Sequence, residues 1–216
     1  MPQIFHRSTN TISRVSIFGL VFILAAILLV LWLLVRSEYA TGVGVHLDQP
    51  VPFSHKHHVG DEGIDCRYCH TTVETAAFAG IPSVEICMNC HSQIWASSPV
   101  LAPVRDAFSK NTPMVWNRVY VLPDFVYFDH SIHVQKGVGC ATCHGPIEQM
   151  PLTAKATSMQ MEWCVECHRD PGKYLRPRDQ VFKVDYVPPA NQAALGQRLI
   201  AEYNVKSKLD CSVCHR

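Results

Sequence analysis

One pentapeptide, Cys-x-x-Cys-His, occurs five times in this 216-residue chain, and its five copies use all ten cysteines. The copies begin at Cys66, Cys87, Cys140, Cys164 and Cys211. Each copy directs two thiols and the imidazole that follows them toward one point. The fold must therefore be built around five such points, and no cysteine is left for another role.

Covalent attachment of c-type haem accounts for this spacing. Two thiols add to the two vinyl groups on one porphyrin edge, and the histidine that follows becomes the proximal iron ligand. Disulfide bonds and zinc sites are the alternatives, but neither requires a histidine after every second cysteine. We therefore expect five haems c, bound through Cys66, Cys69, Cys87, Cys90, Cys140, Cys143, Cys164, Cys167, Cys211 and Cys214, with proximal ligands His70, His91, His144, His168 and His215.

A long apolar run lies near the N-terminus. No charged side chain stands between Ile17 and Val35, and the run is long enough to cross the hydrocarbon core of a bilayer as a helix. Trp32 lies near one end, where an indole suits the membrane interface. A cleaved signal peptide is the competing interpretation, but this apolar run is longer than that of a typical signal. We expect a retained signal-anchor helix over residues 15–36.

The charges beside this run predict its orientation. Arg7 and Arg14 precede it, whereas Arg36 is followed at once by Glu38, so the positive-inside rule places the N-terminus in the cytoplasm. The predicted location is the bacterial cytoplasmic membrane, with a single pass and the haem domain on the periplasmic side. Net charge is +1 with no acidic or basic block, and nothing indicates a nucleic-acid partner.

The soluble part contains an internal duplication marked by Phe-x-His-x-x-His. The first copy places His55 and His58 before the motifs at Cys66 and Cys87. The second copy places His130 and His133 before those at Cys140 and Cys164, roughly 75 residues later. Because the whole element repeats, we expect these four histidines to be distal iron ligands. His57 has no counterpart in the second copy, and His46 lies in the tether, so neither is predicted to be a ligand.

The duplication divides the chain into segments. We predict a cytoplasmic N-terminus (1–14), the anchor (15–36), a tether (37–50), a first dihaem unit (51–96), a connecting insert (97–125), a second dihaem unit (126–176), and a C-terminal helix with the fifth haem (177–216). An amphipathic helix is expected over residues 190–203. The expected fold is a multihaem cytochrome c, mostly irregular, with short α-helices and little or no β-structure. Haem should replace most of the core, so the domain should not fold without it.

Four extra histidines leave one of the five haems without a second imidazole. Methionine sulfur is the remaining soft ligand. The candidates are Met88, Met114, Met150, Met159 and Met161, of which Met159 and Met161, just before Cys164, are the most suggestive. Methionine beside an apolar haem is otherwise a filler of irregular space. A histidine–methionine haem would have a higher potential than its bis-histidine neighbours.

The duplicated element resembles the corresponding part of the small multihaem cytochromes of the c3 and c7 type. That resemblance implies that the first histidine of each copy binds the haem attached next along the chain, which gives His55 to the Cys66 haem and His130 to the Cys140 haem. It further implies that His58 and His133 serve two of the other three haems, and that the phenylalanine packs on a porphyrin. Which two haems they serve does not follow from the spacing.

A wider resemblance covers roughly residues 10–216. The anchor, the runs Gln49-Pro-Val-Pro-Phe-Ser-His55 and Ile64-Asp-Cys66-Arg-Tyr-Cys69-His70, the run Leu122-Pro-Asp-Phe-Val-Tyr-Phe-Asp-His130, and Trp163-Cys-Val-Glu-Cys-His168-Arg together are similar to the pentahaem subunit of alternative complex III. The resemblance implies an electron relay, with quinol oxidised by polytopic membrane subunits, an iron–sulfur subunit as neighbour, and a periplasmic cytochrome c, a copper protein or an oxidase as acceptor.

Two other functions fit parts of the pattern. One is a stand-alone membrane-anchored quinol dehydrogenase of the NapC/NirT kind, although those proteins are usually tetrahaem and place their first motif soon after the anchor. The other is a multihaem reductase, which needs one open iron. No independent catalytic site is expected in this chain, because a single helix without an ionisable residue between Arg14 and Arg36 offers no acid or base for quinol chemistry.

Overall fold

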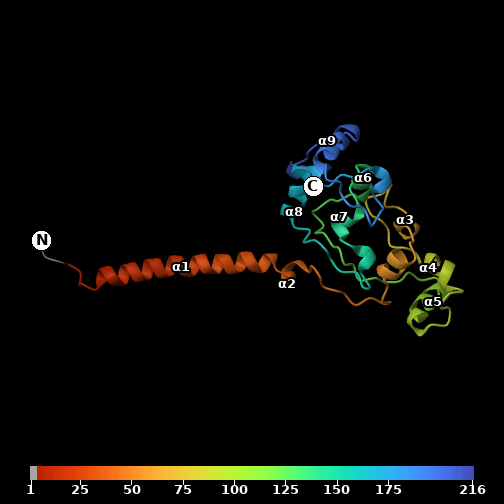
Figure 1. Ribbon diagram of the computed structural model, residues 1–216. Coiled ribbons are helices and arrows are strands. Elements are labelled where there is room, and N and C mark those ends of the chain that lie inside the picture. The colour runs from red at the N-terminus through yellow and green to blue at the C-terminus, as the bar shows by residue number, and fades with distance from the viewer. Residues whose placement is uncertain (1–3) are drawn as a thin grey trace. The chain divides into compact units, whose positions relative to one another are not determined.

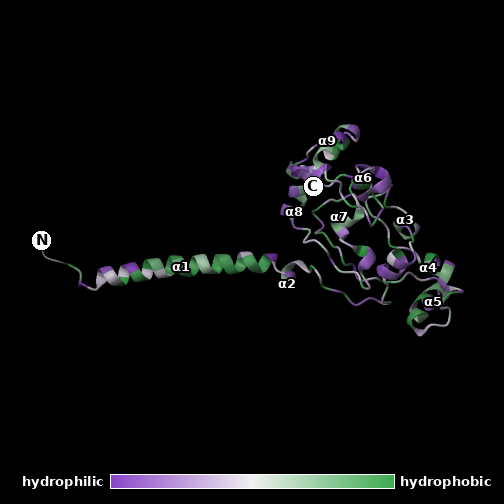
Figure 2. Ribbon diagram, in the orientation of Figure 1, coloured by the Kyte–Doolittle hydropathy of each residue, from purple (hydrophilic) through white to green (hydrophobic). Residues whose placement is uncertain are grey.

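The computed structural model describes residues 4–216 and divides the chain after Gly42 into two units. The first unit contains α1 (Thr9–Arg36), a 28-residue helix, and the short α2 (Glu38–Thr41) (Figure 1). Helix α1 has no buried residue; its first turns are mostly polar and the rest of the helix is mostly apolar (Figure 2). It is the one helix within residues 4–216 that is long and apolar enough to cross a membrane. It begins several residues before the predicted anchor.

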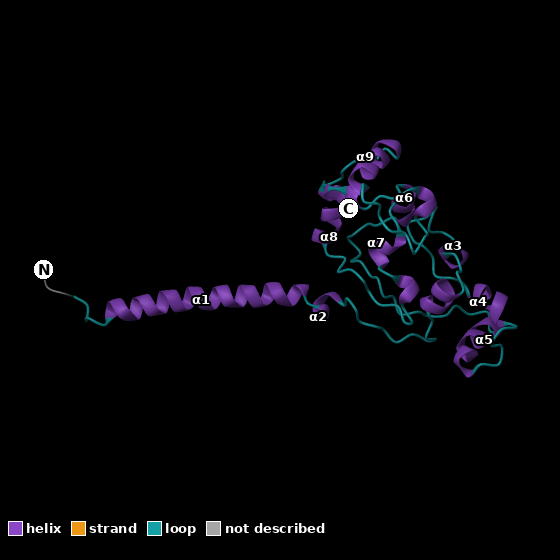
Figure 3. Cartoon of the chain, viewed as in Figure 1, coloured by secondary structure: helices purple, strands orange, loops and turns teal. Residues whose placement is uncertain are grey.

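Short helices and irregular connections make up the second unit, residues 43–216 (Figure 3). No strand forms within residues 4–216, and only isolated β-bridges occur. This confirms the predicted fold class of short helices with little or no β-structure. The helical segments are η1 (Lys56–Asp61), α3 (Cys66–Cys69), α4 (Val84–His91), η2 (Pro99–Leu101), α5 (Ala102–Ser109), α6 (His130–Gln135), α7 (Cys140–His144), η3 (Ile147–Gln149), α8 (Met161–Arg169), η4 (Pro171–Lys173), η5 (Arg178–Gln180), α9 (Gln192–Glu202) and α10 (Cys211–Cys214).

Every Cys-x-x-Cys-His motif begins or lies within one of these helices, namely α3, α4, α7, α8 and α10. A helical turn brings two thiols three residues apart to the same side, which is the arrangement that the spacing predicts. The Asp65 carboxylate caps α3 by accepting a hydrogen bond from the Arg67 amide, at 2.8 Å. The Asp129 carboxylate caps α6 in the same way through the Ser131 amide. Local capping therefore fixes where these short helices start.

One small apolar core joins the chain before the first motif to helices α4 and α5. Its buried residues are Val51, Val84, Leu101, Val104 and Ala107. Cys87 and Met88 of the second motif pack against it, so this core anchors the second attachment loop. Helix α5 lies within the segment predicted as a connecting insert, and a helix was not expected there.

A second core holds α9 against the segment after the fourth motif. Leu175, Leu199 and Tyr203 are almost fully buried in it. Helix α9 approaches η4 so closely that a Cβ on Gly196 would overlap the backbone of Gly172. These glycines allow the C-terminal helix to pack directly on the chain that follows α8.

The cores are small for a unit of this length, whereas many large apolar side chains between them are exposed. Phe78 is 76% exposed, Trp95 65% and Phe125 61%. Protein atoms alone thus bury little of the apolar surface. A fold whose interior is built largely from cofactors has this distribution.

Candidate functional site

The motif imidazoles are oriented by hydrogen bonds from Nδ1 to backbone carbonyl groups. His70 Nδ1 lies 2.7 Å from the Gly80 oxygen and His91 Nδ1 lies 3.0 Å from the Ile94 oxygen. His168 Nδ1 is 3.1 Å from the Lys208 oxygen, and His215 Nδ1 is 3.3 Å from the Phe125 oxygen. A carbonyl oxygen only accepts, so Nδ1 carries the proton in each case and Nε2 keeps a free lone pair. This is the tautomer that a metal-binding imidazole needs.

The histidines of the duplicated element are held in the same manner. His58 Nδ1 lies 2.8 Å from the Ser54 oxygen and His133 Nδ1 lies 2.6 Å from the Asp129 oxygen, the equivalent position of the second copy. His130 Nδ1 lies 2.8 Å from the Ala77 oxygen. His55 Nδ1 lies 2.9 Å from the Thr153 hydroxyl oxygen, an acceptor that can also donate. Nε2 of these rings is again the atom left for a metal.

The two copies of the element have nearly identical ring geometry. Phe53 stacks on His58 with ring centroids 4.4 Å apart and an interplanar angle of 22°, and Phe128 stacks on His133 at 4.6 Å and 24°. Each phenylalanine also meets the first histidine of its element edge-on, at 5.0 Å for Phe53 and 4.8 Å for Phe128. Each phenylalanine thus contacts both imidazoles of its element and helps to orient their ring planes. The duplication seen in the sequence is a duplication of structure at the level of side chains.

Three of the four element histidines have their rings beside the ring of a motif histidine. Ring centroids are 6.1 Å apart for His58 and His91, and 6.1 Å apart for His133 and His168. His130 and His144 are 6.5 Å apart and nearly parallel, at 9°. Two imidazoles that share one metal ion, with metal–nitrogen bonds of about 2 Å, have centroids roughly 6 Å apart. Three imidazole pairs therefore have the separation that a six-coordinate haem iron requires.

The closeness of His55 and His70 is indicated by the effect of His70 on the pKa of His55. Burial and then the neighbouring His70 lower the pKa of His55 to about 4. Burial, followed by His130, His70 and His55, lowers the pKa of His144 to about 4. These four imidazoles therefore lie close together, and the lowered pKa keeps His55 and His144 neutral at ordinary pH, the form of imidazole that binds iron.

The attachment thiols have neighbours from other motifs. Burial and then Cys87 raise the pKa of Cys69, whereas a hydrogen bond with Cys140 lowers the pKa of Cys66 to about 7. Burial, followed by Cys167 and Cys164, raises the pKa of Cys143 to about 12. Burial and then Cys214 raise the pKa of Cys164. The motifs are thus packed closely enough for their thiols to influence one another.

The residues present fit haem c better than zinc. Paired thiols, imidazole rings about 6 Å apart and exposed apolar rings match a flat, apolar, iron-centred group attached at one edge. A structural zinc site needs four converging ligands, and no group of three or more histidine, cysteine or acidic side chains converges on a metal-sized point within residues 4–216.

The remaining predicted residues lie outside these pairs. Met161 is 68% exposed at the start of α8, and Met159 lies two residues before it with a positive φ of 56°. The ring of His215 contacts Phe125, with centroids 5.9 Å apart. His57 stacks on Trp95 at 6.1 Å, and His46 forms an isolated bridge with Ala154. Neither His57 nor His46 was predicted as a ligand.

Three supporting groups were missed by sequence reasoning. Tyr120 places its ring edge-on to His144 at 4.5 Å and holds the third motif by donating to the Cys143 oxygen, at 3.3 Å. Arg176 is buried at 8% exposure, contacts the carbonyl oxygens of Gln180 and Lys183, and lies against Gly139 beside the third motif. The loop before Gly80 receives two ligand imidazoles through its carbonyls. Carbonyl acceptors have no sequence signal, but an arginine surrounded by apolar residues can be noticed.

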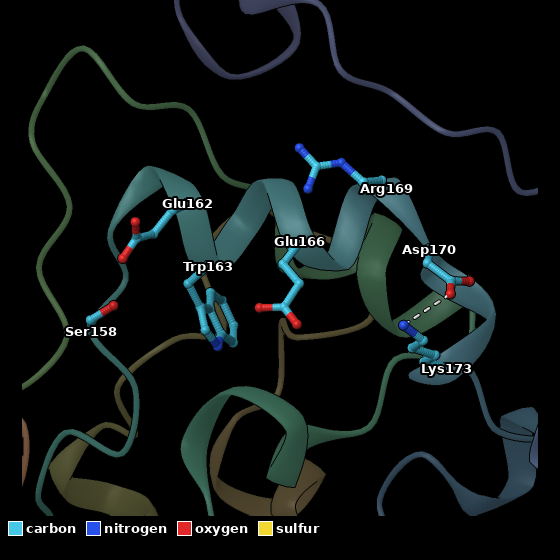
Figure 4. A pocket seen from close by; sticks show the side chains of 7 residues that line it. All are labelled: Ser158, Glu162, Trp163, Glu166, Arg169, Asp170 and Lys173. Carbon is cyan, nitrogen blue, oxygen red and sulfur yellow. Dashed lines mark ion pairs between the residues drawn. The ribbon is translucent and has the colours of Figure 1, made fainter.

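A concavity of about 600 Å³ runs along α8 (Figure 4). It is lined by Ser158, Glu162, Trp163, Glu166, Arg169, Asp170 and Lys173. Trp163 and Glu166 project from the helix on the same side, and Lys173 pairs with Asp170 at 3.2 Å (Figure 4). Charges of both signs and one aromatic ring do not make the mostly apolar lining of a small-molecule pocket. The concavity belongs to the surface beside the fourth motif.

Comparison with known proteins agrees with this geometry. Residues 126–216 match the family described as cytochrome c7 and related cytochrome c. The multihaem cytochrome c subunit of a menaquinone reductase from Nitratidesulfovibrio vulgaris is 36% identical over 124 residues. The match covers 57% of this chain and 52% of that protein, so the chain spans about half the length of the curated relative it matches.

Residues 126–216 therefore form a cytochrome c7-type domain, which includes the motifs at Cys140, Cys164 and Cys211. Beyond this segment, the chain is similar to a multihaem cytochrome c subunit over 57% of its length.

Proposed function

We propose that this chain carries five haems c and relays electrons between a quinone-linked membrane module and an extracytoplasmic redox partner. The observation that carries this proposal is the facing of imidazoles at 6.1 to 6.5 Å, each with one motif histidine and one histidine of the duplicated element. Two strong ligands leave no coordination position for substrate. Closed irons suit electron transfer and do not suit chemistry at the metal.

The pairs give bis-histidine ligands for four of the five haems. His55 with His70 serves the haem at Cys66, and His58 with His91 serves the haem at Cys87. His130 with His144 serves the haem at Cys140, and His133 with His168 serves the haem at Cys164. Each haem supplies reversible one-electron exchange at its iron when bound, and the chain supplies orientation, burial and second-ligand identity.

The fifth haem, with proximal ligand His215, is assigned a methionine ligand, Met159 or Met161. Met161 begins α8 and Met159 lies two residues before it. The effect of Cys214 on the pKa of Cys164 supports closeness of α8 and α10. Methionine ligation would give this site a higher potential than the other four. The positive φ of Met159, 56°, is a backbone conformation that non-glycine residues rarely adopt and functional sites often contain.

The membrane module is inferred from α1 and from the relative. Helix α1 can span a bilayer and is proposed as a retained anchor, with the N-terminus in the cytoplasm and the haem domain outside. The relative is a subunit of a menaquinone reductase, which supports a complex with quinone-binding membrane subunits. An alternative complex III is the specific assembly proposed, with an iron–sulfur subunit as neighbour and a cytochrome c, copper protein or oxidase as the outer partner.

The relative's name describes reduction of menaquinone, whereas an alternative complex III oxidises quinol. The same relay can pass electrons either way, and the potentials of its end partners set the direction. We propose quinol oxidation here on the pattern of anchor, duplication and motif order. The opposite direction is the second candidate, and the relative favours it.

The test starts with the detergent-purified full chain and the complex that co-purifies with it. Pyridine haemochrome should give five haems per chain, and carbon monoxide should bind few or none of the reduced sites. A menaquinol analogue should reduce the haems of the complex but not of the isolated chain. Reduction of the isolated chain would favour the NapC/NirT-like alternative, and carbon monoxide binding at one site with nitrite reduction would favour the reductase.

A further inference from the structure

We infer that the five haem sites lie in space in the order second, first, third, fourth, fifth, where each site is named by its place in the sequence. The inference rests on the proposed ligands and adds what the sequence spacing does not give. It follows from four structural links, each of which joins two sites through residues that are in direct contact.

The first link joins the second and first sites. His55 and His58 lie within one turn of chain and serve the first and second sites, so one short segment holds both distal ligands. The attachment loops also touch: the Asn89 amide of the second motif donates to the Tyr68 hydroxyl of the first, at 3.1 Å. Two haems that share a ligand segment and touch at their attachment loops are neighbours.

The second link joins the first and third sites across the duplication. The loop after the first motif accepts the His70 Nδ1 proton at Gly80, at 2.7 Å, and the His130 Nδ1 proton at Ala77, at 2.8 Å. The backbone amide of His130 also donates to the Ala77 oxygen, at 3.1 Å. One loop therefore orients the proximal ligand of the first site and the distal ligand of the third.

A second bridge joins the same two sites from another side. The Arg67 guanidinium of the first motif lies 4.4 Å above the ring of Phe182. The backbone amide of Cys140 in the third motif donates to the carbonyl oxygen of Val181, the residue before Phe182, at 3.4 Å. The contact between the two dihaem units is thus made at the first and third sites. Without this contact, chain order would have placed the second site next to the third.

The third link joins the third and fourth sites through α6. His130 and His133 are three residues apart on this helix and face His144 and His168, with centroids 6.5 and 6.1 Å apart. Side chains three residues apart on a helix are neighbours on its surface. The irons that they bind must be neighbours as well.

The fourth link joins the fourth and fifth sites. His168 Nδ1 donates to the Lys208 oxygen at 3.1 Å, and the Ser207 hydroxyl donates to the His168 oxygen at 2.8 Å. Both partners lie just before Cys211, where the fifth motif begins. The fourth proximal ligand and the entry to the fifth attachment loop are therefore fixed to each other.

The second and fifth sites each have one link, and the other three have two, so the series has two ends. Figure 1 agrees, because α4 and the C-terminus lie on opposite sides of this unit, with α3 and α7 between them. Electrons that cross the protein must enter at one end and leave at the other. The fifth site differs from the others in its proposed methionine ligand, so the two ends are chemically distinct.

Electron paramagnetic resonance of the oxidised full chain tests this order. His55→Ala, His58→Ala, His130→Ala and His133→Ala should each convert one low-spin signal to high-spin, which assigns four signals and leaves the fifth by subtraction. Magnetic interaction falls steeply with distance, so each conversion should shift only the signals of adjacent haems. His58→Ala should shift one other signal and His55→Ala two, including that of the third site; His57→Ala should shift none.

A shift of the third-site signal in His58→Ala, with none in His55→Ala, would overturn the order while leaving the relay intact. Variants that convert no signal would remove the ligand assignment and the order built on it. A haem count other than five would refute the proposed function itself. If an alanine variant does not fold, the methionine variant keeps six-coordination and raises one potential. Redox titration should then show shifted midpoints at the same neighbours and at no other haem.

Discussion

Replacing His58 by alanine should open one haem and no more. The ring faces His91 with centroids 6.1 Å apart, stacks on Phe53 at 4.4 Å, and donates a hydrogen bond of 2.8 Å to the Ser54 oxygen. His58→Ala removes all three contacts. Apart from the iron bond, the loss is about 1 kcal/mol for the hydrogen bond and about 1 kcal/mol for the ring pair. The covalently attached haem should remain in place.

The assay is carbon monoxide titration of the dithionite-reduced protein, read as a difference from the unmodified chain. Before carbon monoxide is added, about one fifth of the haem in His58→Ala should be high-spin, and the variant should then bind one more equivalent per chain. His57→Ala is the matched control, because His57 stacks on Trp95 and is not a proposed ligand. This variant should bind no additional carbon monoxide. An extra equivalent in His57→Ala and none in His58→Ala would refute the assignment of ligands from ring geometry.

Three further predictions concern the second copy, a buried charge and the second core. His133→Ala should match His58→Ala in carbon monoxide binding, because the two ring sets agree; a different stoichiometry would show that the copies do not function alike. Arg176→Met should lower the midpoint potential of the third haem by about 40 to 80 mV in spectroelectrochemistry, since a cation buried beside the third motif favours the reduced iron by about 1 to 2 kcal/mol. An unchanged potential would mean that the charge is screened. Leu199→Ala should cost about 2 to 5 kcal/mol of unfolding free energy in denaturant titration, whereas Val187→Ala, which is 79% exposed, should cost little; equal losses would contradict the proposed core.

The sequence was sufficient for the parts of the site that depend on local spacing. Cys-x-x-Cys-His states which atoms must meet within one turn, so the attachment loops could be predicted from the residues alone. The repeat of Phe-x-His-x-x-His indicated two similar structures, and their ring distances agree to 0.2 Å, with 4.4 Å for Phe53 and 4.6 Å for Phe128. The apolar run at Ile17–Val35 predicted a helix, and α1 extends it in both directions.

Pairing across the chain could not be predicted in this way. His58 and His91 come together because one core holds α4 and the segment around Val51. That core includes α5, a helix that was not predicted because its segment is rich in proline. Pro103 is compatible with the first turn of a helix, where its missing amide is not needed. The carbonyl groups of Ala77 and Gly80 orient two imidazoles, yet any residue supplies a carbonyl. Such contacts depend on the path of the backbone, which residue identity does not state.

The loop that contains these carbonyls is the point on which the relay depends most. Within each copy, the proposed assignment gives the two histidines of one element to two neighbouring irons, so each copy would form half of the proposed relay. The bonds from His70 and His130 to Gly80 and Ala77 help to join the halves, together with the contact of Arg67 with Phe182. Gly80 has a φ of +81°, which favours glycine, and a Cβ there would crowd the Thr72 hydroxyl that closes the loop. A change at this glycine would therefore move both ligands together, and the spacing between the first and third haems would be the part of the relay most sensitive to mutation.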